Sequence, residues 1–504
     1  MSASIKLVAA LSSAALLLTV AGSAVALGLN PPRLVVPEQE DAIISSVTVL
    51  NPGVERAERQ TIVIRDGRIV EIRPTQAGDP APICNGCIAM PGLIDAHVHS
   101  PPRLAFGNQE LFSLMYLAYG VTSVRDVGES DASIGDMAER LNSGETVGPR
   151  MYRCGPVLDG DPPSWGAARQ VLNSEAARAA VNEIAASGGN CIKVYNELGL
   201  EAYNAVRQAA AAHGLPVVGH VPHHVRLENV RDFESQHFTG VPYVRGGRPA
   251  LTADFSDADF ISMTPADIET ALSLARSHNV SFLPTLANGG RLRLIASDAA
   301  RFQPTPGARF MPEIWTEYWN STAIASHPTG EGIERRLARI PVSEAMTRRA
   351  HEMDIDILAG TDTLMPWVVP GEALQIEIGE LARAMGDNEA ALASATVVNG
   401  RHIADGEIGV IAVGARADIL LLPSDPVENL SALQTWRILF ADGRRYDRER
   451  IDGWMERYWR HFHSPIYTFV MNWAAMIAAG GRGHAPIEGG AVPPPISQPH
   501  ASEH

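Results

Sequence analysis

The sequence predicts an α/β fold, and three observations lead to this prediction. Between residues 91 and 400, short apolar strand-like runs alternate with helical segments. On either side, residues 33–90 and 401–445 contain short β-rich runs and tight turns without a helical period. Strands that alternate with helices pair in parallel, as in βαβ units. The central region contains eight such units, which close naturally into a (β/α)8 TIM barrel.

Eight segments qualify as strands of this barrel. They are residues 93–99, 121–126, 151–158, 191–195, 217–221, 233–238, 281–286 and 356–361. Amphipathic helices are predicted over residues 175–186 and 201–212. His213, His278 and His351 each lie at a helix end just before a strand, where the helix dipole favours a cation. We therefore interpret these three histidines as capping residues rather than metal ligands.

The two flanking segments predict one small domain that is built from both ends of the chain. In the first segment, residues 43–50 and 61–64 are strand candidates, and Asp66-Gly67 is a hairpin signal. In the second segment, residues 417–422 and 436–440 are strand candidates. We expect the two segments to combine as the two parts of a β-sandwich.

The first 26 residues have the pattern of a secretory signal peptide. Lys6 provides a basic start, residues 7–20 are apolar, and Ala24-Val25-Ala26 matches a small-residue cleavage site. An uncleaved membrane anchor is the alternative, although the apolar run is short for a bilayer span. We expect a periplasmic or secreted protein that has no stable membrane insertion after the signal peptide is removed.

The charge balance excludes some classes of partner. The chain has 41 Lys and Arg against 57 Asp and Glu, which gives a net charge of −16. Removing Lys6 with the signal peptide changes this to −16 − 1 = −17. So negative a chain is poorly suited to nucleic acid or an anionic membrane surface. The partner that we expect is a small-molecule substrate.

The four cysteines fall into two pairs. Cys84 and Cys87 form a CxxC at a strand–turn junction, where an exported chain can close a small disulfide. Free thiols are the alternative for this pair. Cys154 and Cys191 lie inside apolar strand-like runs, so we expect them to be buried small hydrophobic residues.

Three further segments depart from the barrel pattern. Residues 287–335 form a long polar insertion after the seventh strand, and a loop of that length is usually a lid or a binding element. Residues 446–480 predict a helical extension whose apolar second half packs against the barrel or another subunit, so a homo-oligomer is possible. Residues 481–504 predict a disordered tail.

Titratable side chains collect at the ends of the predicted barrel strands. His97 and His99 are two residues apart on the first strand, so they point to the same face. Because the carboxyl ends of barrel strands meet at one rim, strands one, four, five, six and eight bring six such side chains together. These six residues are His97, His99, Lys193, His220, His237 and Asp362.

Four histidines and a carboxylate form a ligand set that suits Zn²⁺ or a similar divalent ion. Lys193 needs a separate explanation, because an unpaired ammonium is costly within an apolar strand. Its pKa should fall, and the neutral amine can react with CO₂ to give a carbamate that bridges two metal ions. The alternatives are a lysine that reaches the rim or pairs with a carboxylate, and a mononuclear site in which Lys193 stays an amine.

Five short motifs occur in order along the chain. They are PGLIDAHVH at 91–99, GVTSVRD at 120–126, IKVY at 192–195, AGTDT at 359–363 and GARAD at 414–418. Together they resemble the amidohydrolase superfamily, closest to its imidazolonepropionase-like and prolidase-like branch. The resemblance covers about residues 40–430 of the chain.

The resemblance implies a role for each residue that matches the family's pattern. Two divalent metal ions, expected to be Zn²⁺, activate a hydroxide, and Asp362 is the catalytic proton shuttle. Tyr195 is a candidate hydrogen-bond donor to the substrate, or an aromatic that merely packs at the rim. Gln236 is a departure, because relatives usually have Glu there, which weakens the orientation of the neighbouring ligand. The implied ligands are His97 and His99, with Asp362 nearby, for the more buried ion, His220 and His237 for the more exposed one, and Lys193 as the carbamate bridge.

The expected function is that of an exported metal-dependent hydrolase of carbon–nitrogen bonds. The substrate is expected to be a non-peptide amide such as an N-acyl amino acid, or a dipeptide cleaved by a dipeptidase or carboxypeptidase. A lactonase or organophosphate hydrolase that uses the same binuclear site is the alternative, because the same activated hydroxide attacks those centres. A non-catalytic binding protein is disfavoured, since all six candidate metal residues are present.

Overall fold

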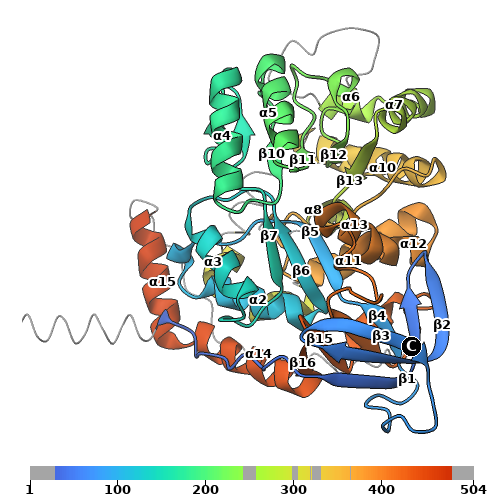
Figure 1. The fold of residues 1–504 in the computed structure, drawn as a ribbon. Coiled ribbons are helices and arrows are strands. Elements are labelled where there is room, and N and C mark those ends of the chain that lie inside the picture. The colour runs from blue at the N-terminus through green and yellow to red at the C-terminus, as the bar shows by residue number, and fades with distance from the viewer. Residues whose placement is uncertain are drawn as a thin grey trace, which may run out of the picture.

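The fold is that of a computed structural model, which describes residues 29–241, 257–297, 305–317, 319, 331–363 and 365–478 (Figure 1). The predicted signal peptide at 1–26 and the predicted tail at 481–504 lie outside the described residues. Parts of the predicted insertion at 287–335 lie outside them as well.

Both flanking segments contribute to one seven-stranded sheet. Strand β4 from the first segment pairs antiparallel with β14 from the second, with Pro91 opposite Ile419. The prediction that both chain ends build one β unit is therefore confirmed, while a second sheet that would complete a sandwich stays a prediction. In spatial order the strands are β16 (Arg444–Asp447), β15 (Ile438–Ala441), β14 (Ile419–Leu422), β4 (Ile88–Pro91), β1 (Ala42–Asn51), β2 (Glu55–Arg65) and β3 (Arg68–Pro74).

The central region contains two sheets in which every pair of neighbouring strands is parallel. The first has the order β5 (Leu93–Val98), β6 (Val121–Asp126) and β7 (Arg150–Arg153). The second has the order β13 (Val280–Leu283), β12 (Phe233–Gln236), β11 (Val217–Gly219), β10 (Ile192–Val194), β8 (Leu158–Asp159) and β9 (Arg169–Gln170). The parallel pairing expected from the alternation of strands and helices is confirmed.

Two of the eight predicted strands differ from expectation. The third, at 151–158, is split into β7 and β8, because Gly155 adopts a φ of 70° and Pro156 has no backbone N–H to donate. The eighth, at 356–361, makes isolated parallel bridges instead of a continuous strand, with Ile357 opposite Phe282 and Thr363 opposite Val98. This segment therefore connects β13 of one sheet to β5 of the other.

Helices separate most of the parallel strands (Figure 1). For two of these helices, side-chain hydrogen bonds explain the residue at which the helix begins. The side chain of Asn173 accepts hydrogen bonds from the first turn of α4, and Thr264 forms a capping box with Asp267 at the start of α7. The helices of this region are α2 (Asn108–Ala118), α3 (Ser133–Asn142), α4 (Ser174–Ala186), α5 (Leu200–Ala212), α6 (Asp257–Ile261), α7 (Pro265–Ser277), α8 (Leu286–Ser297), α10 (Glu331–Glu352), α11 (Glu372–Met385), α12 (Asn388–Ala393) and α13 (Asn399–Ala404), with short turns at Arg103–Ala105, Leu227–Asn229, Pro306–Phe310, Ser394–Val398 and Leu430–Thr435.

The start of the predicted insertion is helical, which corrects the expectation of a loop. Helix α8 begins at Leu286, and the carboxylate of Glu377 accepts a hydrogen bond of 2.6 Å from the backbone N–H of Ala287. A carboxyl oxygen at a helix N-terminus satisfies N–H donors that have no partner within the helix. Glu377 lies 90 residues away in the chain, so this cap could not be predicted locally.

The C-terminal extension is a helix pair, as predicted: α14 (Arg448–Phe462) and α15 (Pro465–Ala478). The hydroxyl of Tyr467 holds α15 against the start of α2, accepting from Asn108 over 3.1 Å. Phe469 and Trp473 face outward. None of the helices in the described parts of the chain is both long and apolar enough to cross a membrane.

The cysteines form two disulfides. Cys84–Cys87 is bonded, as predicted. Cys154 and Cys191 are buried as predicted, but they are bonded to each other, so their interpretation as unbonded hydrophobic residues was wrong. Cys154 directly follows β7 and Cys191 directly precedes β10, and the two strands between them in sequence, β8 and β9, are each two residues long. Their proximity arises from strand order, which composition alone does not show.

The buried disulfide should stabilise the fold more than the turn disulfide does. By loop-closure entropy, the 37-residue separation of Cys154 and Cys191 corresponds to about 4 kcal/mol and the 3-residue separation of Cys84 and Cys87 to about 2 kcal/mol. We expect Cys154→Ala/Cys191→Ala to lower the midpoint of thermal unfolding more than Cys84→Ala/Cys87→Ala does. Equal midpoints for the two double variants, measured by circular dichroism at one scan rate, would contradict this ranking.

Candidate metal centre

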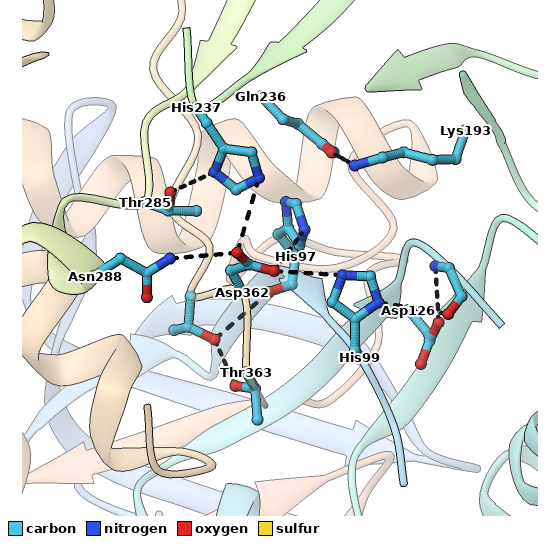
Figure 2. Close-up of polar contacts among 12 residues, drawn as sticks. His97, His99, Asp126, Lys193, Gln236, His237, Thr285, Asn288, Asp362 and Thr363 are labelled. Carbon is cyan, nitrogen blue, oxygen red and sulfur yellow. Dashed lines mark hydrogen bonds and ion pairs between the residues drawn. The ribbon is translucent and has the colours of Figure 1, made fainter. Parts of the chain in front are cut away.

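The site is centred on the carboxylate of Asp362 (Figure 2). Its Oδ1 lies 3.3 Å from the Nε2 atoms of both His97 and His99, and its Oδ2 lies 3.9 Å from Nε2 of His237. His97 and His99 come from β5 and the residue just beyond it, and His237 directly follows β12. Ligand atoms of His97, His237 and Asp362 all lie within 4.8 Å of one another. The structure thus brings these four predicted residues together.

Backbone contacts fix this convergence. The N–H of Asp362 donates to the carbonyl of His97 over 2.8 Å, and the N–H of Thr361 donates to the buried carboxylate of Asp95 over 3.0 Å. Asp362 and His237 have φ values of 60° and 57°, a left-handed conformation that costs free energy in residues other than glycine. Such strained residues persist where the surrounding structure holds them, and they cluster at functional sites.

The protonation pattern of the histidines directs lone pairs toward Asp362. Nδ1 of His237 lies 2.6 Å from the hydroxyl oxygen of Thr285, whose own hydrogen is donated to the carbonyl of Pro284. Nδ1 of His99 faces the carbonyl of Gly128 at 3.4 Å. Each Nδ1 therefore faces an acceptor and carries the proton, which leaves Nε2 with a lone pair.

His220 shows the same pattern on the neighbouring strand. It follows β11, it is buried, and its Nδ1 lies 2.7 Å from the amide oxygen of Asn196. Its ring stacks on Tyr195 at 4.1 Å between centroids and lies 5.3 Å from the ring of His237. The preceding residue must be glycine, since a Cβ on Gly219 would lie 2.2 Å from a backbone oxygen of β10. His220 and Tyr195 therefore lie side by side at this rim.

Lys193 is buried in the middle of β10 and lies beside the histidines without contacting Asp362 directly (Figure 2). Its Nζ donates to the side-chain oxygen of Gln236. Burial lowers the pKa of Lys193 to about 7. Much of the lysine is therefore a neutral amine near neutral pH, as the sequence analysis anticipated.

Burial also shapes the ionisation of the other groups. It lowers the pKa of His237 to about 4 and holds the pKa values of His97 and His220 well below the usual range. Burial alone would raise the pKa of Asp362, but the neighbouring histidines, His97 above all, hold it well below its ordinary value. His99 differs, because contact with Asp362 outweighs burial and raises its pKa. The site therefore combines three neutral imidazoles, those of His97, His220 and His237, with an ionised carboxylate.

This donor set fits a divalent metal ion. Both ring nitrogens of His97 are buried and have no hydrogen-bond partner among the described residues. Lone pairs on the Nε2 atoms face carboxylate oxygens, and acceptors opposite acceptors are unfavourable unless a cation lies between them. Imidazole nitrogen and carboxylate oxygen are the ligand types that Zn²⁺ and related ions take.

Sequence reasoning missed three polar or aromatic neighbours of the site. Thr285 orients His237, and Asn288 donates from Nδ2 to Oδ2 of Asp362 over 3.3 Å. Both lie in or next to the first turn of α8, the segment that was expected to be a loop. Trp165 stands beside His99, with 5.8 Å between ring centroids. The sequence signal for Thr285 and Asn288 is their position just after the seventh strand.

Comparisons with solved structures show the same fold at low sequence identity. Bottromycin amidohydrolase matches with a TM-score of 0.65 and 23% identity, over 88% of this chain and 93% of that protein. An Xaa-Pro dipeptidase with bound methionine matches with a TM-score of 0.59 and 19% identity, over 81% and 100%. Ochratoxinase from A. niger matches with a TM-score of 0.58 and 17% identity, over 81% and 95%. No curated protein matches the chain by sequence.

The sequence itself matches a family model that extends well beyond the site. This model describes the amidohydrolase family and matches residues 88–444, which contain all four histidines, Lys193 and Asp362. The chain therefore belongs to the amidohydrolase family of hydrolases, with prolidase-like relatives among its structural neighbours.

Proposed function

We propose that this protein is an exported metal-dependent amidohydrolase that cleaves an amide C–N bond in a dipeptide or an N-acyl amino acid. The observation that carries this proposal is the convergence of Nε2 atoms from three histidines on the carboxylate of Asp362. Family membership supports hydrolysis as the reaction. The proposed scaffold is a closed eight-stranded barrel, completed by the bridges that residues 356–363 make to β13 and β5.

The proposed centre holds two divalent ions, with Zn²⁺ as the expected metal. Its ligand set is His97, His99 and Asp362 on one side, His220 and His237 on the other, and Lys193 between them. Lys193 would contribute as a carbamate. Its neutral amine attacks the carbon of CO₂, forms an N–C bond and releases one proton to solvent, so one N–H remains. The low pKa of the buried amine supports this step.

Each residue of the site has a separate role in the proposed hydrolysis. Bound metal ions supply Lewis acidity, which polarises a carbonyl and lowers the pKa of water toward neutrality. Asp362 accepts the proton of the attacking water and delivers it to the leaving amine nitrogen. The phenol of Tyr195, whose pKa burial raises to about 12, stays protonated and donates a hydrogen bond to the substrate carbonyl or carboxylate. Asn288 orients Asp362 through its 3.3 Å hydrogen bond.

Export to the periplasm or the medium is part of the proposal. Two disulfides occur among the described residues, and disulfides persist in oxidising compartments. The signal-like pattern of residues 1–26 supports the same location. Determination of the N-terminal residue of the protein recovered from a secreting host tests this directly, and an intact Met1 would contradict signal cleavage.

The substrate proposal draws on the structural neighbours. By its name, the Xaa-Pro dipeptidase acts on dipeptides, and this motivates the choice of substrate class. At 19% identity its likeness to this chain shows a shared fold, so the substrate of this chain stays a proposal. A panel of dipeptides, N-acyl amino acids, lactones and organophosphate esters separates the candidates. Turnover of amides supports the proposal, whereas turnover confined to lactones or phosphate esters would replace it with the alternative hydrolase.

Asp362 should be needed for turnover more than for metal affinity. In Asp362→Asn the histidine ligands remain, while the carboxylate that moves the proton is lost. We expect most of the bound metal to be kept and kcat to fall by about two to four orders of magnitude. Metal analysis by mass spectrometry and steady-state kinetics on one amide substrate check this. A variant with more than a tenth of the original kcat would contradict the role of Asp362 as proton shuttle.

Lys193 should determine the metal stoichiometry. The unaltered chain is expected to bind two divalent ions per chain, and Lys193→Ala, which removes the bridging group, should bind about one and lose activity. Arg178→Ala is a matched control, because Arg178 lies on α4 outside the site. An active Lys193→Ala variant with unchanged metal content would rule out the bridge and leave a mononuclear site.

A further inference from the structure

A chain of buried polar side chains leads from Lys193 away from the rim. The amide nitrogen of Gln236 donates to Oε1 of Glu234 over 3.0 Å, while its amide oxygen accepts from Lys193. Nη2 of Arg125 lies 2.5 Å from the same Oε1 of Glu234. The proposed mechanism uses Lys193, but it gives no role to Arg125 and Glu234.

This chain has only one consistent direction of hydrogen bonding. The guanidinium of Arg125 can only donate hydrogen bonds, so Oε1 of Glu234 accepts from it. Glu234 then requires the NH₂ group of Gln236 on its side, which turns the amide oxygen toward Lys193. A rotated Gln236 would place two acceptors against each other at Glu234, so the Glu234 end fixes the orientation of the amide.

Arg125 also contacts the strand that carries the first pair of ligands. Its Nε donates to the carbonyl of Ala96 over 2.9 Å, directly before His97. The side chains of Arg125 and Glu234 are 2% and 4% exposed. A buried ion pair contributes little net stability compared with apolar residues of the same volume, so a role in specifying structure is the better explanation for this one.

We propose that Arg125 and Glu234 are positioning residues of the metal centre. They fix the amide of Gln236, and Gln236 in turn holds Nζ of Lys193 in the orientation that a bridging ligand needs. The inference rests on the proposed function of Lys193. The remaining N–H of a lysine carbamate donates to Gln236 just as the amine does, so the network serves both forms of the residue.

A cavity gives experimental access to the far end of this network. It has a volume of about 290 Å³ and lies at the amino ends of β11, β12 and β13, away from the rim that carries Asp362. Arg125 and Glu234 form part of its lining. Truncation of Arg125 should therefore leave a hole that a small guanidinium ion can fill from solvent.

The first test removes both charges together. Arg125→Met/Glu234→Leu avoids a lone buried charge, so the variant should fold. We expect its metal content to fall from two ions toward one per chain, its carbamate ¹³C signal after labelling with ¹³C-bicarbonate to disappear, and kcat/KM to fall about 10- to 100-fold. The matched control is Arg448→Met/Asp452→Leu, another shielded ion pair, on α14 and remote from the site, which should keep both ions and the signal.

The second test is chemical rescue of Arg125→Ala. Millimolar guanidinium chloride should restore the carbamate signal and the second metal ion, whereas the same concentration of sodium chloride should not. If both variants keep two ions and the ¹³C signal, and only their unfolding midpoints fall, the pair is merely structural and the inference is wrong. Failure of the proposed function is distinguishable, because it shows in the unaltered chain as fewer than two ions or no carbamate signal.

Discussion

The structure of this site depends on one constraint: a partly buried, ionised carboxylate must lie opposite the Nε2 atoms of several histidines. Oδ1 of Asp362 lies 3.3 Å from the Nε2 atoms of both His97 and His99. Backbone hydrogen bonds between residues 361–362 and β5 hold the two segments together, at the cost of a left-handed backbone at Asp362. The arrangement is electrostatically sensible when a divalent cation occupies the space between these groups.

A buried ion pair lies beneath the rim. Arg125 stands on β6 and Glu234 on β12, and their side chains meet where apolar side chains would fill the interior of the proposed barrel. Its hydrogen bonds run toward both halves of the ligand set, through Gln236 to Lys193 and through the Ala96 carbonyl to the strand of His97. The Arg125–Glu234 pair thus supports proposed ligands that stand on different strands. Residues that hydrogen-bond to metal ligands affect metal affinity by about one to two orders of magnitude.

Much of the site could be predicted from sequence because its signals are local. The two-residue spacing of His97 and His99 fixes a common face, and His220, His237 and Asp362 each lie at the end of a predicted strand. The lysine in an apolar strand predicted a lowered pKa, which the structure supports. The parallel pairing of the central strands followed in the same way from the alternation of strands and helices.

The features that sequence could not provide all depend on contacts distant in the chain. The disulfide between Cys154 and Cys191 depends on which strands are neighbours, and the cap of α8 depends on Glu377 from α11. The eighth strand was predicted at the correct position, but in the structure this segment forms isolated bridges instead of a regular strand. β-Propensity does not indicate how many ladder hydrogen bonds a short segment forms. Asn288 was overlooked because residues 287–335 were expected to form a loop, and Thr285 because residues 281–286 were expected to form a strand, which ends at Leu283 in the structure.

The claim that these residues form a binuclear metal centre is tested most directly by anomalous diffraction from crystals grown with zinc. Data collected on either side of the zinc absorption edge should show two peaks, one near His97, His99 and Asp362 and one near His220 and His237, with density for a carboxylated Lys193 between them. A single peak, or no peak among these side chains, would contradict the account.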